Sequence, residues 1–244
     1  AIIWAKGISF CDTYSGSTMP ESVTDRPTKA HEDIFLLAKS ERYFYDHEAV
    51  KEAAATGWNG SSFTDERDAI TKPGLGRGPR TETATRNLRD VWAISPTPYK
   101  AAHFATFSPS LVGPMIKAGS SERGACPRCG APWERVVDRE PMEIARSGRR
   151  DAMGEYGRTQ PSGTMVKPPT STTIGWQPTC SCNAGDPVPC IVLDPFSGAG
   201  TTVLVADRLG RNGVGLDLSG TYTRMGRDRV FNDAPLLALM GAIA

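Results

Sequence analysis

A glycine-rich turn between an apolar run and an amphipathic run constrains this chain most. Residues 191–193 are apolar and lead into Asp194-Pro-Phe-Ser-Gly-Ala-Gly-Thr-Thr202, after which residues 203–209 have helical periodicity. This order predicts a strand, a tight turn and a helix, as in the first crossing of a nucleotide-binding α/β unit. Gly198 and Gly200 let the backbone approach a ligand without a Cβ, and the N–H groups of the helix start point to the same place.

A second acidic residue extends this pattern to a complete β-α-β unit. Gly210 suits the C-terminal end of the helix, residues 213–216 read as the next strand, and Ser219 suits the start of another helix. Asp217, at the end of the second strand, is placed to accept the ribose hydroxyls of an adenosine. Asp194 is a fixed negative charge that repels a pyrophosphate and attracts an ammonium group. The pattern therefore favours S-adenosylmethionine (SAM) over NAD.

Residues 193–230 resemble the cofactor half of DNA amino-methyltransferases, which methylate adenine N6 or cytosine N4. The family carries D-P-F-x-G-x-G-T-T, a strand ending in glycine, an aliphatic residue, an acid and leucine, and then a helix with a tyrosine. This chain matches nearly all of it, with Asp217 in place of the more usual glutamate. The resemblance implies SAM as methyl donor. The cofactor-binding residues that it implies are Asp194, Phe196, Ser197, Gly198, Gly200, Thr201, Thr202 and Asp217.

The N-terminal part resembles the last hairpin of the catalytic half of the same family. We expect strands at 2–5 and 34–38, and we assign residues 1–45 to this hairpin. Residues 46–90 would then be the variable, target-recognising region, beginning with a short helix at 48–55. The arginines of this region suit contacts with DNA phosphates, and its composition equally suits a solvated linker.

Residues 91–122 resemble the family segment that closes over the methionine end of SAM. A short strand is expected at 91–94. Ser108 and Pro109 are predicted to begin a helix that ends at Gly119. By the resemblance, His103 and Phe107 also bind the cofactor.

No catalytic residue is predicted within the chain. Ser95-Pro-Thr-Pro-Tyr99 is similar to the catalytic tetrapeptide of the family, but Thr97 is inserted and moves the ring away from the base platform. The family's order places the catalytic strand before Ala1. The chain also opens without Met, inside an expected strand. We therefore expect a fragment that is incomplete at its N-terminus and inactive on DNA by itself.

Two cysteine pairs indicate a metal site. Cys126-Pro-Arg-Cys129-Gly and Cys180-Ser-Cys182 together offer four thiolates, the ligand set of a tetrahedral structural Zn²⁺. Metal-free cysteines stay an alternative, whereas disulfides are not expected in a cytoplasmic protein. The zinc would staple the ends of a Cys-rich insertion, assigned to residues 123–190.

These patterns define an expected fold class. It is an α/β, Rossmann-like class I SAM-dependent methyltransferase sheet, circularly permuted and incomplete at the N-terminus, with a zinc-knuckle-like insertion. Residues 191–244 form its SAM-binding unit. A net charge of +1 gives no global basic field. The chain has no apolar run long enough for a membrane and no signal peptide, which predicts a cytoplasmic protein without a membrane partner.

The expected function is methyl transfer from SAM to an exocyclic amine of adenine or cytosine in double-stranded DNA, as in restriction–modification. Two alternatives stay open. One is a non-catalytic, DNA-associated remnant that binds SAM and zinc. The other is a methyltransferase that acts on RNA or protein. A homodimer is also left open.

Overall fold

The computed structural model describes residues 1–6, 22–53, 85–97, 99, 106–141, 143–146, 163–167 and 170–233. The predicted site residue His103 and most of the region 46–90 lie outside them. The chain divides into two compact units. Unit 1 consists of Ala1–Val50, Leu88–Arg135 and Trp176–Ala244, and unit 2 consists of Lys51–Asn87 and Val136–Gly175.

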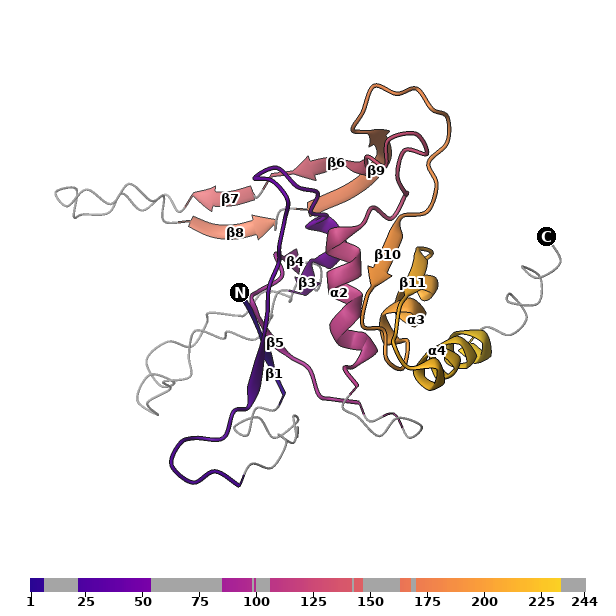
Figure 1. Ribbon diagram of the computed structural model, residues 1–244. Helices are drawn as coiled ribbons and strands as arrows, with labels where there is room; N and C mark the ends of the chain where they lie inside the picture. The colour runs from indigo at the N-terminus through magenta and orange to yellow at the C-terminus, as the bar shows by residue number, and fades with distance from the viewer. Residues whose placement is uncertain are drawn as a thin grey trace, which may run out of the picture. The chain divides into compact units, whose positions relative to one another are not determined.

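The C-terminal part of unit 1 is the predicted β-α-β unit followed by a helix (Figure 1). Its elements are β10 (Ile191–Asp194), α3 (Thr201–Arg208), β11 (Asn212–Gly215) and α4 (Gly220–Asp233). The two strands run parallel, with Ile191 opposite Asn212 and Asp194 opposite Gly215. This pairing brings the two predicted acidic positions to the same edge of the sheet.

The helix predicted after Ser108 is α2 (Pro109–Gly119). The Ser108 hydroxyl accepts a hydrogen bond from the Ser110 N–H, and Pro109 occupies the first turn, where its missing N–H costs nothing. The predicted cap and the predicted end at Gly119 are both confirmed.

Helix α2 carries two small hydrophobic clusters. Val112 and Ile116 pack with Val205 and Ala206 of α3. Leu111 packs with Trp4 and Trp92, which belong to the N-terminal strands of unit 1. Because one helix contributes to both clusters, it links the β-α-β unit to the N-terminal sheet. The fold is therefore α/β, although the described strands form separate sheets rather than one continuous class I sheet.

The N-terminal sheet contains β1 (Ile2–Ala5), β2 (His31–Ile34) and β5 (Val91–Ala93), in the order β2-β1-β5. The prediction of a strand at 34–38 was wrong. Antiparallel pairing with β1 ends at Ile34, and the following apolar residues Phe35–Leu37 are exposed. The predicted helix at 48–55 was also wrong, because the chain forms a 3-10 turn, η1 (Glu48–Val50), and then a strand, β3 (Glu52–Ala53).

The Cys-rich insertion contains strands that the sequence did not predict. They are β6 (Trp133–Glu140), β7 (Glu143–Arg146), β8 (Gly163–Lys167) and β9 (Thr170–Pro178). β6 pairs with β9 and β7 with β8, while β3 pairs with β4 (Thr85–Arg86). In the described residues, no helix is both long and apolar enough to cross a membrane.

Candidate cofactor and metal sites

The glycine turn between β10 and α3 has the left-handed backbone that only glycine adopts without strain. The φ angles of Gly198 and Gly200 are 49° and 73°. A Cβ on Gly200 would lie 2.8 Å from the Gly226 Cα of α4, whereas a Cβ on Gly198 would have no heavy atom within 4 Å. Gly200 is therefore required for packing of α3 against α4, and Gly198 stands at an open surface.

Both predicted acidic residues brace this turn. Asp194 accepts hydrogen bonds from the Phe196 N–H at 3.0 Å and from the Thr202 hydroxyl at 2.6 Å. Asp217 accepts from the Gly198 N–H at 2.9 Å and from the Ser219 N–H at 2.7 Å. A carboxylate oxygen has two lone pairs, so each acid keeps acceptor capacity for a ligand. The two strand ends are thus tied to one turn by charge-assisted bonds.

A cavity of about 570 Å³ opens beside the turn. Four predicted cofactor residues line it: Ser197, Gly198, Gly200 and Asp217. Its volume is typical of small-molecule sites, which span about 300–1,000 Å³. Helix α4 also supplies lining residues that were not predicted as cofactor contacts, although the sequence shows their helical spacing from Tyr222. They are Tyr222, Thr223, Gly226, Arg227, Val230 and Phe231.

The other predicted cofactor residues lie elsewhere around the turn. Phe196 is 86% exposed at the tip of the loop, and Thr201 is buried in the first turn of α3. Phe107 and Thr202 line a second, largely apolar cavity of about 490 Å³ beside α2. The predicted residues are thus divided between two cavities, and Asp194, Phe196 and Thr201 line neither of them.

Arg229 of α4 is a further residue at the turn. Its guanidinium donates to the Ala199 carbonyl at 3.2 Å and to the Thr201 hydroxyl at 2.9 Å. The same group stacks 4.4 Å from the ring centre of Tyr99. Tyr99, from the segment similar to the catalytic tetrapeptide, thus packs against Arg229. Burial lowers the pKa of Arg229.

The four predicted metal ligands come together. The Sγ atoms of Cys126, Cys129, Cys180 and Cys182 all lie within 4.8 Å of one another, with Cys126 buried. Backbone N–H groups of Cys129 and Arg128 lower the pKa of Cys126 to about 7. The neighbouring thiols, Cys129 first, raise the pKa of Cys182 to about 12. The thiols of the tetrad therefore lie close enough to shift one another's pKa.

Backbone hydrogen bonds shape the loop that presents the first cysteine pair. The Cys126 carbonyl accepts from the Gly130 N–H at 2.9 Å, which closes the turn. Ala125 and Val188 exchange two N–H···O bonds, of 2.8 and 2.9 Å. Gly124 has a φ of 115°, and a Cβ there would lie 2.3 Å from the Val188 carbonyl oxygen. The loop is therefore held against the segment that precedes β10.

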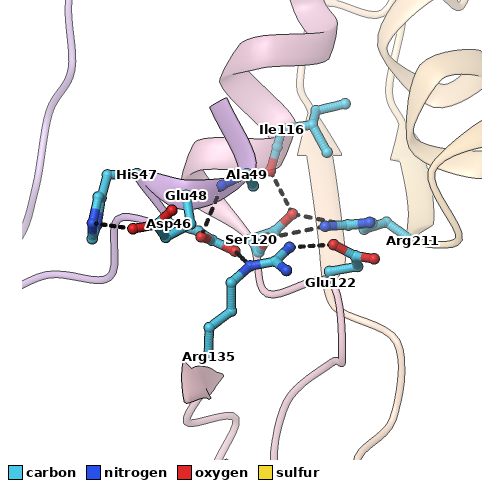
Figure 2. Close-up of polar contacts among 9 residues, drawn as sticks. All are labelled: Asp46, His47, Glu48, Ala49, Ile116, Ser120, Glu122, Arg135 and Arg211. Atoms are coloured by element: carbon cyan, nitrogen blue, oxygen red, sulfur yellow. Dashed lines mark hydrogen bonds and ion pairs between the residues drawn. The ribbon is translucent and has the colours of Figure 1, made fainter. Parts of the chain in front are cut away.

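A charged network lies at the end of α2, where β6 begins (Figure 2). Arg135 donates to Asp46 at 2.7 Å and also to Glu122, and it stacks 4.4 Å from the ring centre of Trp176. Burial opposes the charge of Arg135, but the two carboxylates, Asp46 first, raise its pKa. No local sequence pattern indicated this pairing.

A second arginine in Figure 2, Arg211, bonds to the end of α2 beside this network. Arg211 is only 6% exposed and donates to the Ser120 hydroxyl and carbonyl, both at 3.2 Å. The Ser120 hydroxyl donates in turn to the Ile116 carbonyl at 2.6 Å. The end of α2 is thus bonded to the residue that precedes β11.

The sequence is similar to those of known methyltransferases. The chain is 28% identical over 88% of its length to the Type II methyltransferase M.XycI of Xanthomonas campestris pv. cyanopsidis. It is 38% identical over 43% of its length to M.Cfr9I of Citrobacter freundii, and 26% identical over 86% to M.SmaI of Serratia marcescens. The matches span 41%, 26% and 41% of these relatives, so the chain covers less than half of each.

A family model described as DNA methylase matches residues 1–126 and 180–228. The match includes the glycine turn, both acidic residues, α2 and the N-terminal sheet, and leaves the internal segment 127–179 and the C-terminal residues 229–244 unmatched. It therefore covers well over half of the sequence and both hydrophobic clusters of unit 1. The chain belongs to the DNA methylase family.

Proposed function

We propose that this protein uses SAM to methylate an exocyclic amino group, adenine N6 or cytosine N4, in double-stranded DNA. Family membership supports methylation of DNA in general. The glycine turn, with its flanking acids and the cavity beside it, supports SAM as the donor. The relatives named above are Type II methyltransferases, which favours a role in restriction–modification.

The observation that carries the choice of cofactor is the chemistry around Gly198. Its left-handed backbone leaves an open face, and its N–H is held by Asp217 at 2.9 Å. An adenosine fits here because the Asp217 carboxylate accepts ribose hydroxyls. A dinucleotide fits poorly, since the Asp194 carboxylate beside the turn repels a pyrophosphate. This charge instead favours a ligand that carries ammonium and sulfonium groups.

When bound, SAM supplies a methyl group activated by the positive sulfonium sulfur. The chain's own residues would hold the donor in place: Asp217 would orient the ribose, and Asp194 would attract the ammonium end. Holding two reactants in a productive geometry removes most of the entropic cost of their encounter. A target base must leave the DNA stack to present its amine. No residue of this chain is assigned as the catalytic group of that transfer.

His103 and Phe107 are proposed at the methionine end of SAM, as the family resemblance implies. We also propose the circularly permuted order, because the β-α-β unit follows α2 and the N-terminal sheet. Phe196 and the two threonines of the turn complete the proposed cofactor set.

A structural Zn²⁺ at the cysteine tetrad is part of the proposal. The four thiols are the donor set that zinc prefers, and their Sγ atoms converge within 4.8 Å of one another. With four protein ligands, such an ion has no open position for a substrate and takes no part in methyl transfer.

The test is nucleoside analysis of methylated DNA. The protein expressed from its complete natural gene is incubated with SAM carrying a labelled methyl group and with double-stranded DNA, and the DNA is digested to nucleosides. We expect the label in N6-methyldeoxyadenosine or N4-methyldeoxycytidine. Label on a ring carbon of cytosine, or only on RNA or protein offered in parallel, would contradict the proposal.

A further inference from the structure

We propose that the zinc ion clamps together the two ends of the segment that the family model leaves unmatched, residues 127–179, and fixes them to the methylase core. This inference rests on the zinc part of the proposed function. It develops the stapling role expected from the sequence: the ion closes the base of an added segment, so that the family core keeps its connection from α2 to β10.

The position of the tetrad in the chain supports this role. The family match stops at Cys126 and resumes at Cys180, so each boundary falls on a cysteine of the tetrad. Cys126 and Cys129 stand at the start of the unmatched segment, and Cys180 and Cys182 directly follow its end. A single ion bound by both pairs would therefore join residues that lie 50 or more positions apart in sequence.

The geometry of the tetrad needs only a small contraction to hold zinc. A tetrahedral ion with Zn–S bonds of about 2.3 Å has its sulfurs about 3.8 Å apart. The four Sγ atoms lie within 4.8 Å of one another without a metal. Thiols are weak hydrogen-bond donors and acceptors, so the cluster has no strong internal bond of its own.

Polar contacts also join the two ends of the segment beyond the cysteines. We call the tetrad and these contacts together the joint. The Thr179 hydroxyl donates to the Pro132 carbonyl at 2.7 Å, and the Gln177 amide donates to Glu134 at 2.6 Å. These contacts pair the outgoing chain with the incoming one. Both bonds are exposed, so each contributes little alone.

The last contact of the joint also reaches the core. At this segment the chain leaves unit 1 after Arg135 and returns to it at Trp176. The Arg135 guanidinium stacks on the Trp176 ring. Arg135 also binds Asp46, whose own N–H donates to the Ala118 carbonyl of α2 at 2.9 Å. The joint is thus tied to the end of α2 on one side, and the Ala125–Val188 pair ties it to the segment before β10 on the other.

The experiment measures metal content and local protection in the purified chain. We expect one zinc per chain by elemental analysis, with less than a tenth of that in Cys126→Ser and in Cys182→Ser. Cys190→Ser is the matched control, because Cys190 lies outside the tetrad, and it should keep the full amount. A chain with intact thiols that holds no metal, holds iron instead, or keeps its zinc in the serine variants would overturn the proposal.

Hydrogen exchange on the wild-type protein tests the clamp without depending on whether a variant folds. Removal of zinc by a chelator should raise the exchange rates of the Ala125, Trp133 and Val188 amides at least tenfold, and return of zinc should restore them. Unchanged rates at these amides would refute the clamp. SAM titration of the same samples separates the zinc clamp from the proposed methyl donor. If the zinc-loaded chain does not bind SAM, only the choice of SAM as donor is contradicted.

Discussion

The two glycines of the turn provide a sharp test because they have similar backbones and different surroundings. Alanine in a left-handed conformation costs about 1–2 kcal/mol. Gly198→Ala should destabilise the fold by that amount only, since a Cβ there meets no heavy atom within 4 Å. In Gly200→Ala the Cβ also meets the Gly226 backbone at 2.8 Å.

Such an overpacked contact adds about 1–3 kcal/mol, so the free energy of unfolding should fall by about 2–5 kcal/mol in Gly200→Ala. For a chain of this size each kcal/mol shifts Tm by about 2–4 °C. The order of the two variants should be reversed for SAM affinity, which Gly198→Ala should lower more than Gly200→Ala does once both are folded. Gly198→Ala puts a methyl group into the space proposed for SAM and should weaken binding at least tenfold in a folded protein.

Urea unfolding and calorimetric titration with SAM measure both quantities on the same samples. Gly185→Ala is a suitable control, with a φ of 81° and an unobstructed Cβ, outside both the glycine turn and the cysteine tetrad. It should lose about 1–2 kcal/mol and keep its SAM affinity. Equal stability of the Gly198 and Gly200 variants, or undiminished SAM binding by Gly198→Ala, would refute the reasoning.

Two further substitutions test the charged contacts. Arg135→Met leaves the buried Asp46 carboxylate without its ion-pair partner, and should cost about 3–5 kcal/mol in urea unfolding; a loss below about 1 kcal/mol would show that Asp46 is solvated. Arg229→Lys keeps the charge but loses the planar group that bonds the turn and stacks on Tyr99. The turn should loosen, so Tm should fall and SAM affinity should fall several-fold; an unaltered Tm and affinity would show that these contacts do not hold the turn.

The β-α-β unit was predictable because its signals are local. The apolar run of β10, the two glycines and the capping Ser219 each act within a few residues, and the structure confirms the order of elements. The start of α2 at Ser108 was predictable for the same reason. Spacing alone also brought out the cysteine tetrad.

The parts that could not be predicted depend on distant partners. β6 is rich in charged residues and lacks the alternation of a half-buried strand, so its pairing with β9 left no signal. The end of β2 is set by its register with β1 rather than by the apolar residues that follow Ile34. Arg135 and Asp46 are 89 positions apart, and neither residue indicates the other.

The central claim is that SAM binds at the glycine turn, and photochemical crosslinking tests it most directly. The chain is irradiated with SAM labelled in its methyl group, and the labelled peptide is identified, with Asp217→Asn as the binding-site variant and Asp228→Asn, an exposed residue of α4, as the matched charge control. We predict label within residues 191–231, lost in Asp217→Asn and kept in Asp228→Asn. Label outside this range, or label that both variants retain, would contradict the account.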